Sequence, residues 1–573
     1  MRLSRPARST VSAAAVAAIA ATSLVSCSNE AESIPFIGYS IDNTVSTYNV
    51  GTVAGSMSGA AQAFSRVLPG FSLIAPSGGA VNDTDIGTAL QVPGAQQVIT
   101  YTFASAATWS DGVPMTCDDL VLAWIARSGR GGTEGVPAFD AASTAGYADI
   151  ERIDCAPADK VATVTFFPGR NYIDWPTLFG AGAMMPAHVA SRIAGVPDVV
   201  TTVAGGDDAA LGRLAEAWNT AWNLTAAPSG SPGTVDPAVF VSSGPFRIDS
   251  YSVDGGVVLV PNEAWWGVPA STDRIVVWPK GVDIAEKATS GEIEVVDAGG
   301  GTSTPDGFTT AADPAFGIEQ LILATSGVFA DPAARRAFAA CVPRNDLYAQ
   351  HGHPGFDVES GRGSAVVDSR TTLPATLPYR AIAGTAAERY RTPDLAGVTA
   401  GLAEAGLTDP VVRIGYLAPD QRRSAVVAQI AAACGPMGID VVDESSELFS
   451  PVGMRAGQVD VVLAGTAAQV GATGTSSAGP DRFALRGGQG VNVGGYANQR
   501  YDELVDQLAV DRSDATVLSA GIEAENILWN DMPTLPLYNA PRVTAVASGM
   551  RGVESNPTVA GAGWNMDKWN FVG

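Results

Sequence analysis

The stretch that decides the fold reads SSGPFRIDSY (Ser242–Tyr251), DGGVVLVPNEAWWG (Asp254–Gly267), STDRIVVWP (Ser271–Pro279) and ATSGEIEVV (Ala288–Val296). β-Branched residues alternate or run together between Gly-Pro and Asp-Gly-Gly breaks in this stretch. Such a pattern is typical of short paired strands joined by a tight turn. We therefore predict strands at Val239–Ile248, Val257–Val260 and Arg274–Trp278, with two tryptophans packed against the chain reversal at Asn262–Gly267.

The order of these motifs resembles the diagnostic block of the peptide-type extracytoplasmic solute-binding proteins of ABC importers (family 5, cluster C). That family has a Gly-Pro-Phe/Tyr strand, an Asn-x-x-Tyr/Trp-Trp-Gly turn, another strand and a helix ending in Ser-Gly-Glu/Asp-Ile-Glu/Asp. The resemblance implies an α/β fold of two lobes, like type II periplasmic binding proteins, with mixed sheets flanked by helices and an extra subdomain in the first lobe. An ordinary β-rich enzyme domain is the alternative.

A second block lies upstream and reads ITYTFASAATWSDGVPMTCDDLVLAW (Ile99–Trp124). It predicts a strand, a turn and a helix that begins at Thr116, with Asp119 completing a capping box. Leu120, Val121, Trp124 and Ile125 form one apolar helix face. The family carries the same Trp-Ser-Asp-Gly-x-Pro-x-Thr-x-x-Asp run, and the resemblance implies architectural roles for Trp109 and Asp111.

The C-terminal half continues the resemblance. Asp331 and Pro332 are typical of a helix start, and Thr392 and Pro393 are expected to open a helix that stops at Gly406. A strand is predicted at Val411–Leu417, a helix at Arg422–Cys434 and a second strand at Ile439–Val442. A buried strand at Val459–Leu463 follows, then helices at Asn492–Leu508 and Ala515–Trp529, and finally a returning strand at Met532–Val543.

The predicted organisation is a signal peptide (1–26), a tether (27–36), a first lobe (37–296) with an inserted subdomain (about 90–240), a second lobe (297–530) and a return to the first lobe (531–573).

The N-terminus has the composition of a secretory leader. Three arginines, Arg2, Arg5 and Arg8, precede a short apolar run, Val11–Val25. LVSC (Leu24–Cys27) resembles a lipobox, so we expect Cys27 to be acylated and the protein to be anchored by lipid at the extracytoplasmic face of the cell membrane. A buried structural cysteine is the alternative. No later stretch has eighteen consecutive apolar residues.

The net charge limits the possible partners. The formal charge is −24, and loss of the three leader arginines takes it to −27. An acidic surface repels polyphosphate backbones, and no basic stripe or nucleic-acid motif offsets that repulsion. We therefore exclude nucleic acid as a partner.

Four cysteines remain besides Cys27: Cys117, Cys155, Cys341 and Cys434. An even number in an exported protein suggests two disulfides, and four cysteines allow three pairings. We favour Cys117–Cys155 and Cys341–Cys434, because each pair then stays inside one predicted lobe. No two cysteines have zinc-ligand spacing, which argues against a metal site.

The sequence offers little catalytic chemistry. His188, His351 and His353 are the only histidines, and none lies in a G-x-S-x-G or H-E-x-x-H context. The HGHPG run could hold a metal, but it is a weak signal. No phosphate-binding glycine loop is present. We therefore expect a non-enzymatic protein without a cofactor.

One departure from the family bears on the ligand. Peptide-binding members carry an acidic residue, in a tryptophan-containing loop after the strand equivalent to Val459–Leu463, that pairs with the peptide's α-amine. Here the loop reads AGTAAQVGATGTSSAG (Ala464–Gly479), with no acid before Asp481 and no tryptophan. A buried ammonium without a counter-charge is costly. The sequence therefore weakens, without removing, the prediction of peptide import.

Four stretches resemble one group in particular. They are GYSIDNTVSTYNVGT (Gly38–Thr52), DTDIGT (Asp83–Thr88), CDDLVLAWIARSGR (Cys117–Arg130) and GWNMDKW (Gly563–Trp569). They look closest to the LpqW lipoproteins of mycobacteria and related actinobacteria. This resemblance implies a mannosylated phosphatidylinositol ligand, or a membrane mannosyltransferase partner, and a role in lipoarabinomannan synthesis. A peptide and an ABC permease are the alternative partners.

Sugars stack on aromatic faces and are oriented by fixed polar groups. On this ground the candidate cleft residues are Tyr48, Trp265, Trp266, Asn492 and Trp564, and for each of them a place in the core is the alternative. The implied ligand is anionic and so is the protein, so recognition must depend on local complementarity.

Overall fold

The computed structural model describes residues 36–572, except 131, 133–137, 225–232, 253–254, 300–301, 353–365, 373–376, 387–388 and 466–482. The predicted signal peptide, the tether with Cys27, and His353 therefore lie outside the described residues. Within the described residues, no helix is both long and apolar enough to cross a membrane.

One mixed sheet runs through the described structure. Its eleven strands lie in the order β15 (Asp440–Asp443), β14 (Val411–Gly415), β16 (Val461–Gly465), β13 (Phe308–Leu323), β17 (Thr534–Ala547), β12 (Val295–Gly299), β1 (Ile37–Ile41), β11 (Ile275–Trp278), β10 (Gly256–Pro261), β9 (Phe246–Ser252) and β8 (Gly233–Thr234). β1 is parallel to β11 and β12, and β14 is parallel to β15 and β16. The remaining neighbours are antiparallel.

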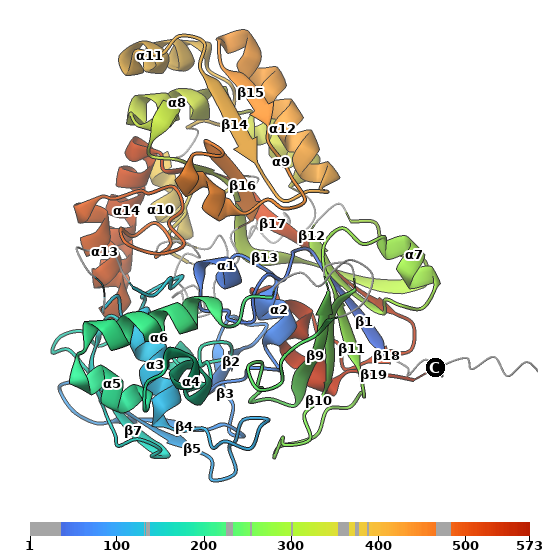
Figure 1. Cartoon of the computed structure of the whole chain (residues 1–573). Helices are drawn as coiled ribbons and strands as arrows, with labels where there is room; N and C mark the ends of the chain where they lie inside the picture. Colours follow the sequence, from blue (N-terminus) through green and yellow to red (C-terminus); the bar gives the residue numbers. More distant parts are fainter. Residues whose placement is uncertain are drawn as a thin grey trace, which may run out of the picture. The chain divides into compact units, whose positions relative to one another are not determined.

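β13 and β17 are the strands that connect the two lobes (Figure 1). At one end β17 pairs with the first-lobe strand β12, and at the other end β13 pairs with the second-lobe strand β16. Their register shifts between Pro314, opposite Pro541, and Ile318, opposite Asn539. Extra residues on one strand bend it and increase its twist, and proline has no N–H for the ladder. The sheet is therefore irregular at the crossing between the lobes.

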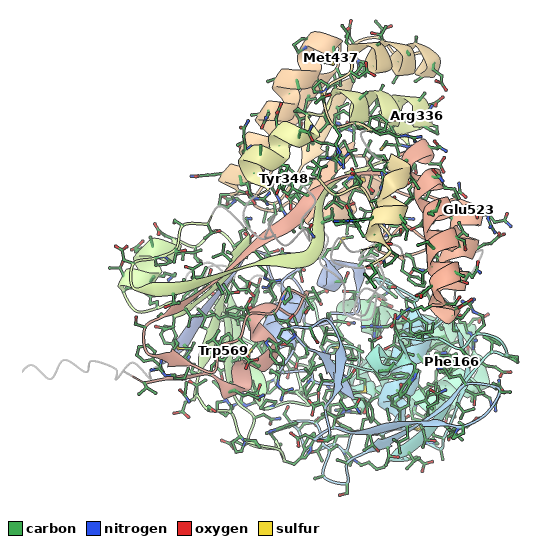
Figure 2. The ribbon with its side chains drawn as sticks, turned by 180° about the vertical axis from the view of Figure 1, so that it is seen from behind. Phe166, Arg336, Tyr348, Met437, Glu523 and Trp569 are labelled. Carbon is green, nitrogen blue, oxygen red and sulfur yellow. A yellow bond between two sulfur atoms is a disulfide. The ribbon has the colours of Figure 1, made fainter. Side chains whose placement is uncertain are left out.

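The first lobe contains the inserted subdomain. There β4 (Gly87–Val92), β5 (Val98–Phe103), β7 (Val161–Phe166) and β6 (Ile150–Asp154) form an antiparallel sheet, with α3 (Cys117–Arg127), α4 (Ala187–Ala194), α5 (Val199–Gly205) and α6 (Asp208–Thr220) gathered beside it (Figure 1). The rest of the lobe adds α1 (Val53–Ser56), α2 (Ala60–Phe64), β2 (Ser72–Ile74), β3 (Ala80–Asn82), α7 (Ile284–Thr289), β18 (Met550–Arg551) and β19 (Asn570–Phe571). Viewed from behind, Phe166 and Trp569 mark two separate parts of this lobe (Figure 2).

The capping box predicted for α3 is present. Thr116 caps the helix reciprocally with Asp119, whose carboxylate also accepts a hydrogen bond from the Trp109 indole at 3.3 Å. The side chains of Trp109 and Asp119 are buried. Burial raises the pKa of Asp119 to about 7, although three donors oppose the shift. Trp109 and Asp119 therefore hold the turn against the helix. Asp111 lies at the surface, where its carboxylate contacts His188 Nε2 at 3.0 Å.

In the second lobe, the strands β14 to β16 are packed by α8 (Pro332–Cys341), α9 (Arg344–His351), α11 (Leu395–Ala405) and α12 (Gln421–Cys434), whereas α10 (Tyr379–Ala383) lies beside α14 (Asp514–Asp531) (Figure 1). Arg336, Tyr348 and Met437 mark this lobe from behind (Figure 2). Asp331 caps α8 by accepting from Ala333 N at 2.8 Å, as predicted. The predicted start of α11 needs correction, since Asp394 is the N-cap and the helix begins at Leu395.

One other expectation differs from the structure. The first predicted strand begins at Phe246 rather than Val239, because Ser242 and Gly244 form a turn in which the Ser242 hydroxyl accepts from Gly244 N. The helices α13 (Gln499–Val510) and α14 (Asp514–Asp531) fall in the predicted second lobe and contribute to both cores. Leu504 and Ala524 lie in the buried cluster of the first lobe, and Trp529 of α14 lies in that of the second lobe.

Each predicted lobe contains one disulfide, Cys117–Cys155 and Cys341–Cys434, with Cα separations of 6.6 Å and 5.0 Å. This is the pairing that we favoured. The described residues contain no group of three or more His, Cys, Asp or Glu side chains arranged to hold a metal ion.

Candidate ligand-binding cavity

A cavity of about 950 Å³ lies between the two lobes. The first lobe contributes the segments 42–46, 56–58 and 279–282, and the second lobe contributes 417–419 and 447–451. Residues of β13 and β17, the strands that connect the lobes, also line it. Its volume is at the upper end of the range for small-molecule sites.

On the second-lobe side, Glu319 of β13 is buried between two arginines at the start of α12. Its Oε1 accepts from Arg422 Nη2 at 3.1 Å and from Arg423 Nε at 2.9 Å. Burial alone would raise the pKa of the carboxyl, but the two guanidinium charges outweigh it and lower the pKa to about 2. Arg422 Nη1 also donates to the Tyr538 hydroxyl at 3.1 Å. This side is therefore fixed by a buried ionic cluster.

On the first-lobe side, Asp297 of β12 is held by Arg542 of β17. Two parallel hydrogen bonds join them, Nε to Oδ1 at 2.6 Å and Nη2 to Oδ2 at 2.7 Å. The Tyr39 hydroxyl donates to the same carboxylate at 3.0 Å, and Ala562 N donates at 2.8 Å. Burial works to raise the pKa of Asp297, but the arginine and these donors hold it below its usual value.

Lys280 connects the two sides. Its Nζ lies 2.7 Å from Asp42 Oδ1 in the first lobe and 3.1 Å from Asp420 Oδ2, at the N-terminus of α12 in the second lobe. The lysine side chain is 7% exposed. Ionic contacts of this kind are screened less by salt than surface pairs are.

The cavity charges thus balance within the described structure. Each of the four lining cations, Lys280, Arg422, Arg423 and Arg542, has a carboxylate partner. Glu447, by contrast, is an exposed carboxylate at the wall. A charged ligand group that replaced one partner would leave a buried charge unpaired, which is costly.

The remaining lining is neutral. Four amides (Asn43, Gln62, Gln320, Asn492), two aromatic rings (Tyr251, Phe449) and aliphatic residues such as Met57, Leu224, Val257, Leu417 and Val491 face the cavity. Amide groups offer both donors and acceptors, and apolar surfaces bury hydrocarbon. The cavity can therefore bind a neutral ligand that has polar and apolar parts.

Of the predicted cleft residues, Asn492 lines the cavity. Its side chain also shapes a turn, since Nδ2 donates to Tyr496 O at 2.6 Å and Oδ1 accepts from Tyr496 N at 3.0 Å. Tyr48 instead lies in the first-lobe core, where it packs edge-on against Phe64 and donates to Val241 O at 2.9 Å.

The three predicted tryptophans also lie outside the cavity. Trp265 donates to Val268 O at 2.9 Å, Trp266 donates to Asp85 O at 2.6 Å, and their rings pack together at 4.5 Å. Trp564 donates to Glu554 O at 3.2 Å. Each indole N–H thus donates to a backbone carbonyl away from the cavity.

The sequence prediction missed Glu319, Arg422, Arg423 and Arg542. Two signals were present: a single glutamate among the apolar residues of Ile318–Leu323, and two consecutive arginines after the helix cap Asp420. The loop Ala464–Gly479 begins at the cavity, because Ala464 and Gly465 line it. The rest of that loop lies outside the described residues.

Comparison with known proteins gives a consistent family. The model of the bacterial extracellular solute-binding proteins, family 5, matches residues 91–479. An uncharacterized lipoprotein of Mycobacterium tuberculosis is 40% identical over 558 residues, which cover 96% of this chain and 95% of the relative. The oligopeptide-binding protein OppA of the same species is 24% identical over 87% of this chain and 79% of the relative.

The fold has solved counterparts. The oligopeptide-binding protein AppA of Bacillus subtilis, in complex with a nonapeptide, superimposes with a TM-score of 0.69 at 13% identity, over 94% of this chain and 100% of AppA. The two-lobed fold expected from the sequence is therefore confirmed, as is an extracytoplasmic location, which agrees with the family and its lipoprotein relatives. Proteins of this fold are generally binding proteins rather than enzymes. The motifs, the cavity between two lobes and a family match across more than half of the chain lead to one conclusion: this chain belongs to the family 5 bacterial extracellular solute-binding proteins.

Proposed function

We propose that the protein is a non-catalytic envelope lipoprotein whose interlobe cavity binds a mannosylated phosphatidylinositol, as in the LpqW group. Through this ligand, or through a membrane mannosyltransferase, it serves lipoarabinomannan synthesis. The observation that carries the proposal is the lining of amides, aromatic rings and aliphatic side chains, in which each cation is already paired.

This lining can bind the sugar and the acyl chains of a glycolipid, but not its phosphate. Mannose hydroxyls can exchange hydrogen bonds with amides, and the apolar face of a sugar can pack on Tyr251 or Phe449. Acyl carbons can bury against residues such as Met57 and Leu417. Because the cavity cations are neutralised, we place the phosphate at the mouth, where water solvates it.

The anchor is part of the proposal. It is supported by the leader, by the lipobox-like LVSC at Leu24–Cys27 and by relatives named as lipoproteins. We expect that Cys27→Ala moves the protein from the detergent phase to the aqueous phase in a partition assay. Unchanged membrane association would contradict acylation at Cys27.

Peptide capture for an ABC permease is the second candidate. It is favoured by the OppA relatives and by the nonapeptide in the AppA structure. A peptide also brings an ammonium group, and Ala464–Gly479 offers no acid to pair with it. A cavity of about 950 Å³ has room for several residues of either ligand.

Native mass spectrometry of the delipidated protein tests the two candidates. The protein is offered envelope mannolipids and a mixture of peptides. We expect mannolipid adducts and no stable peptide adducts. Tight peptide capture would select the second candidate. If the protein captures neither, the version in which it acts through a mannosyltransferase remains. Normal lipoarabinomannan in a strain lacking the protein would contradict that version.

A further inference from the structure

Gln320 and Thr558 are the described residues of the cavity wall that have a buried side-chain oxygen without a hydrogen-bond partner. Gln320 lies on β13 and is 3% exposed. Its Oε1 is buried, and no donor among the described residues bonds to it. A buried acceptor without a donor destabilises the folded state, and such groups are rare in native proteins. Its presence therefore calls for a physical reason.

The strands around Gln320 explain why it has no partner. Its cross-strand neighbours are Ala464 on β16 and Pro536 on β17, neither of which has a side-chain donor. The ladder between β13 and β17 also shifts register between Glu319 and Gln320. Such irregularities change the direction of a side chain. The fold therefore presents this amide at the wall without satisfying it.

The other amides of the cavity differ from Gln320 because they serve the fold. Asn43 donates to Met57 O at 3.1 Å and accepts from Thr44 N at 2.8 Å. Asn492 bonds Tyr496 in both directions. Gln62 donates to Asp297 Oδ2 at 3.1 Å. For Gln320 the described structure shows no side-chain hydrogen bond at all, so no hydrogen bond of the protein opposes rotation of the amide toward the cavity.

The described surroundings of Gln320 favour a neutral partner. The nearby carboxylate of Glu319 is neutralised by Arg422 and Arg423, and the amide itself carries no charge. Among the described residues, an ammonium at Gln320 would find no unpaired carboxylate beside it and would lose its hydration, which is costly. A hydroxyl or an amide N–H loses less hydration and regains a hydrogen bond at Oε1.

We propose that Gln320 determines ligand specificity by accepting, at Oε1, a hydrogen bond from a neutral hydroxyl or N–H group of the ligand. The inference rests on the proposed function, in that it requires a ligand in this cavity. The last torsion of glutamine is broad, so the oxygen can turn to the cavity surface without movement of β13. A site with such an acceptor discriminates against ligands that lack the donor, because they leave the acceptor unpaired.

The test uses Gln320→Leu, which keeps a similar volume and removes the acceptor. Two probes are titrated by calorimetry: dodecyl mannoside, whose donors are hydroxyls, and a capped trialanine, whose donors are amide N–H groups. We expect the affinity for the probe that binds to fall about tenfold, the worth of one hydrogen bond. We also expect the melting temperature of the empty variant to stay level or rise, because a buried unpaired acceptor is gone. A purely structural residue would lower the melting temperature instead.

Gln97→Leu is the matched control. Gln97 is 4% exposed, and its Oε1 also has no donor in the described structure, but it lies outside the cavity. We expect wild-type affinity for this variant. Permethylated dodecyl mannoside, which has no hydroxyl donor, should bind the wild type and Gln320→Leu equally.

The outcomes separate this inference from the proposed function. If the wild type binds neither probe, both the cavity function and the role of Gln320 are overturned. If the wild type binds and Gln320→Leu binds equally well, only the role of Gln320 is overturned. A lower melting temperature of the empty variant would also overturn it. If Gln320→Leu loses affinity only for dodecyl mannoside, the donor is a sugar hydroxyl. If it loses affinity only for the capped trialanine, the donor is an amide N–H.

Discussion

The two lobes stabilise their sides of the cavity with different arrangements of the same groups. In the first lobe, Asp297 is held by one arginine, a tyrosine hydroxyl and a backbone N–H. In the second lobe, Glu319 is held by two arginines from one helix. Asp420, 3.7 Å from Arg423, supplies the second carboxylate on that side, so neither side depends on the other for charge neutrality. Closure of the cleft therefore needs to form only one ionic contact in this set, between Lys280 and Asp420.

The largest effect on the stability of each lobe is expected from removal of its disulfide. Cys341–Cys434 spans 93 residues in the second lobe, and Cys117–Cys155 spans 38 in the first. In the chain-entropy model, removal of the longer crosslink costs about 5 kcal/mol and removal of the shorter one about 4 kcal/mol. We expect the double serine variants to lower amide protection in their own lobe only. Hydrogen exchange with mass spectrometry measures each lobe separately, and equal loss in both lobes would contradict their independence.

The next largest effect is expected at Glu319. Glu319→Ala leaves Arg422 and Arg423 buried without this carboxylate, and breaking a buried pair in this way costs about 3–5 kcal/mol. The measurement is the urea midpoint, together with exchange in α12 and β13. Glu447→Ala is the control, because this exposed glutamate lines the same cavity and its loss should change stability by less than about 0.5 kcal/mol. Similar effects of the two substitutions would refute the role of the cluster.

Two buried glutamates predict opposite responses to pH. Glu294 accepts from Gly38 N at 2.6 Å, and burial raises its pKa from 4.5 to about 7. Between these values the folded state keeps a proton that the unfolded state has released, so stability falls as pH rises through this window, by roughly 3 kcal/mol. Glu319 has a lowered pKa of about 2, so its contribution is present above 4.5 and is lost as pH falls toward 2.

Melting temperatures at pH 5 and pH 8 test the Glu294 prediction. Glu294→Gln keeps an acceptor for Gly38 N and should remove most of the difference between the two pH values. Glu292→Gln is the neighbouring control, since hydrogen bonds from Lys287 and Ser290 lower the pKa of Glu292 and it stays ionised across this range. A pH response unchanged in Glu294→Gln would assign it to another group.

The sequence predicted the fold better than the site, for a physical reason. Strands and caps depend on patterns within short segments, such as the capping box of Thr116 and Asp119 or the apolar residues Val461–Leu463 of β16. The cavity instead combines residues that are far apart in the chain, such as Asp42, Lys280 and Asp420. No local pattern places such residues together, and no element was predicted at β13, which carries both Glu319 and Gln320.

The predicted cleft residues show the same limit. Tyr48, Trp265, Trp266 and Trp564 were chosen because aromatic residues recognise sugars. Residue type does not indicate where an indole N–H points, and here it points to a backbone carbonyl such as Val268 O or Glu554 O. The useful signals were residues that conflict with their surroundings, namely Glu319 and Gln320 between Ile318 and Leu321.

The smallest predicted effect concerns the contact that joins the lobes. Asp420→Asn keeps the helix cap, because an amide oxygen can still accept from Arg423 N, but it removes the charge opposite Lys280. We expect the closed form to lose about 1 kcal/mol relative to the open form, which raises the open-to-closed ratio about fivefold. Pulsed spin-label distances between the exposed positions Val268 and Leu395 measure that ratio. Asp42→Asn is the control, because it breaks the bond of the same lysine within the first lobe and should open the cleft less. A double-mutant cycle with Lys280→Met isolates the pairwise energy. If the two asparagine variants open the cleft equally, the lysine acts within the first lobe, and closure depends on the ligand rather than on this ion pair.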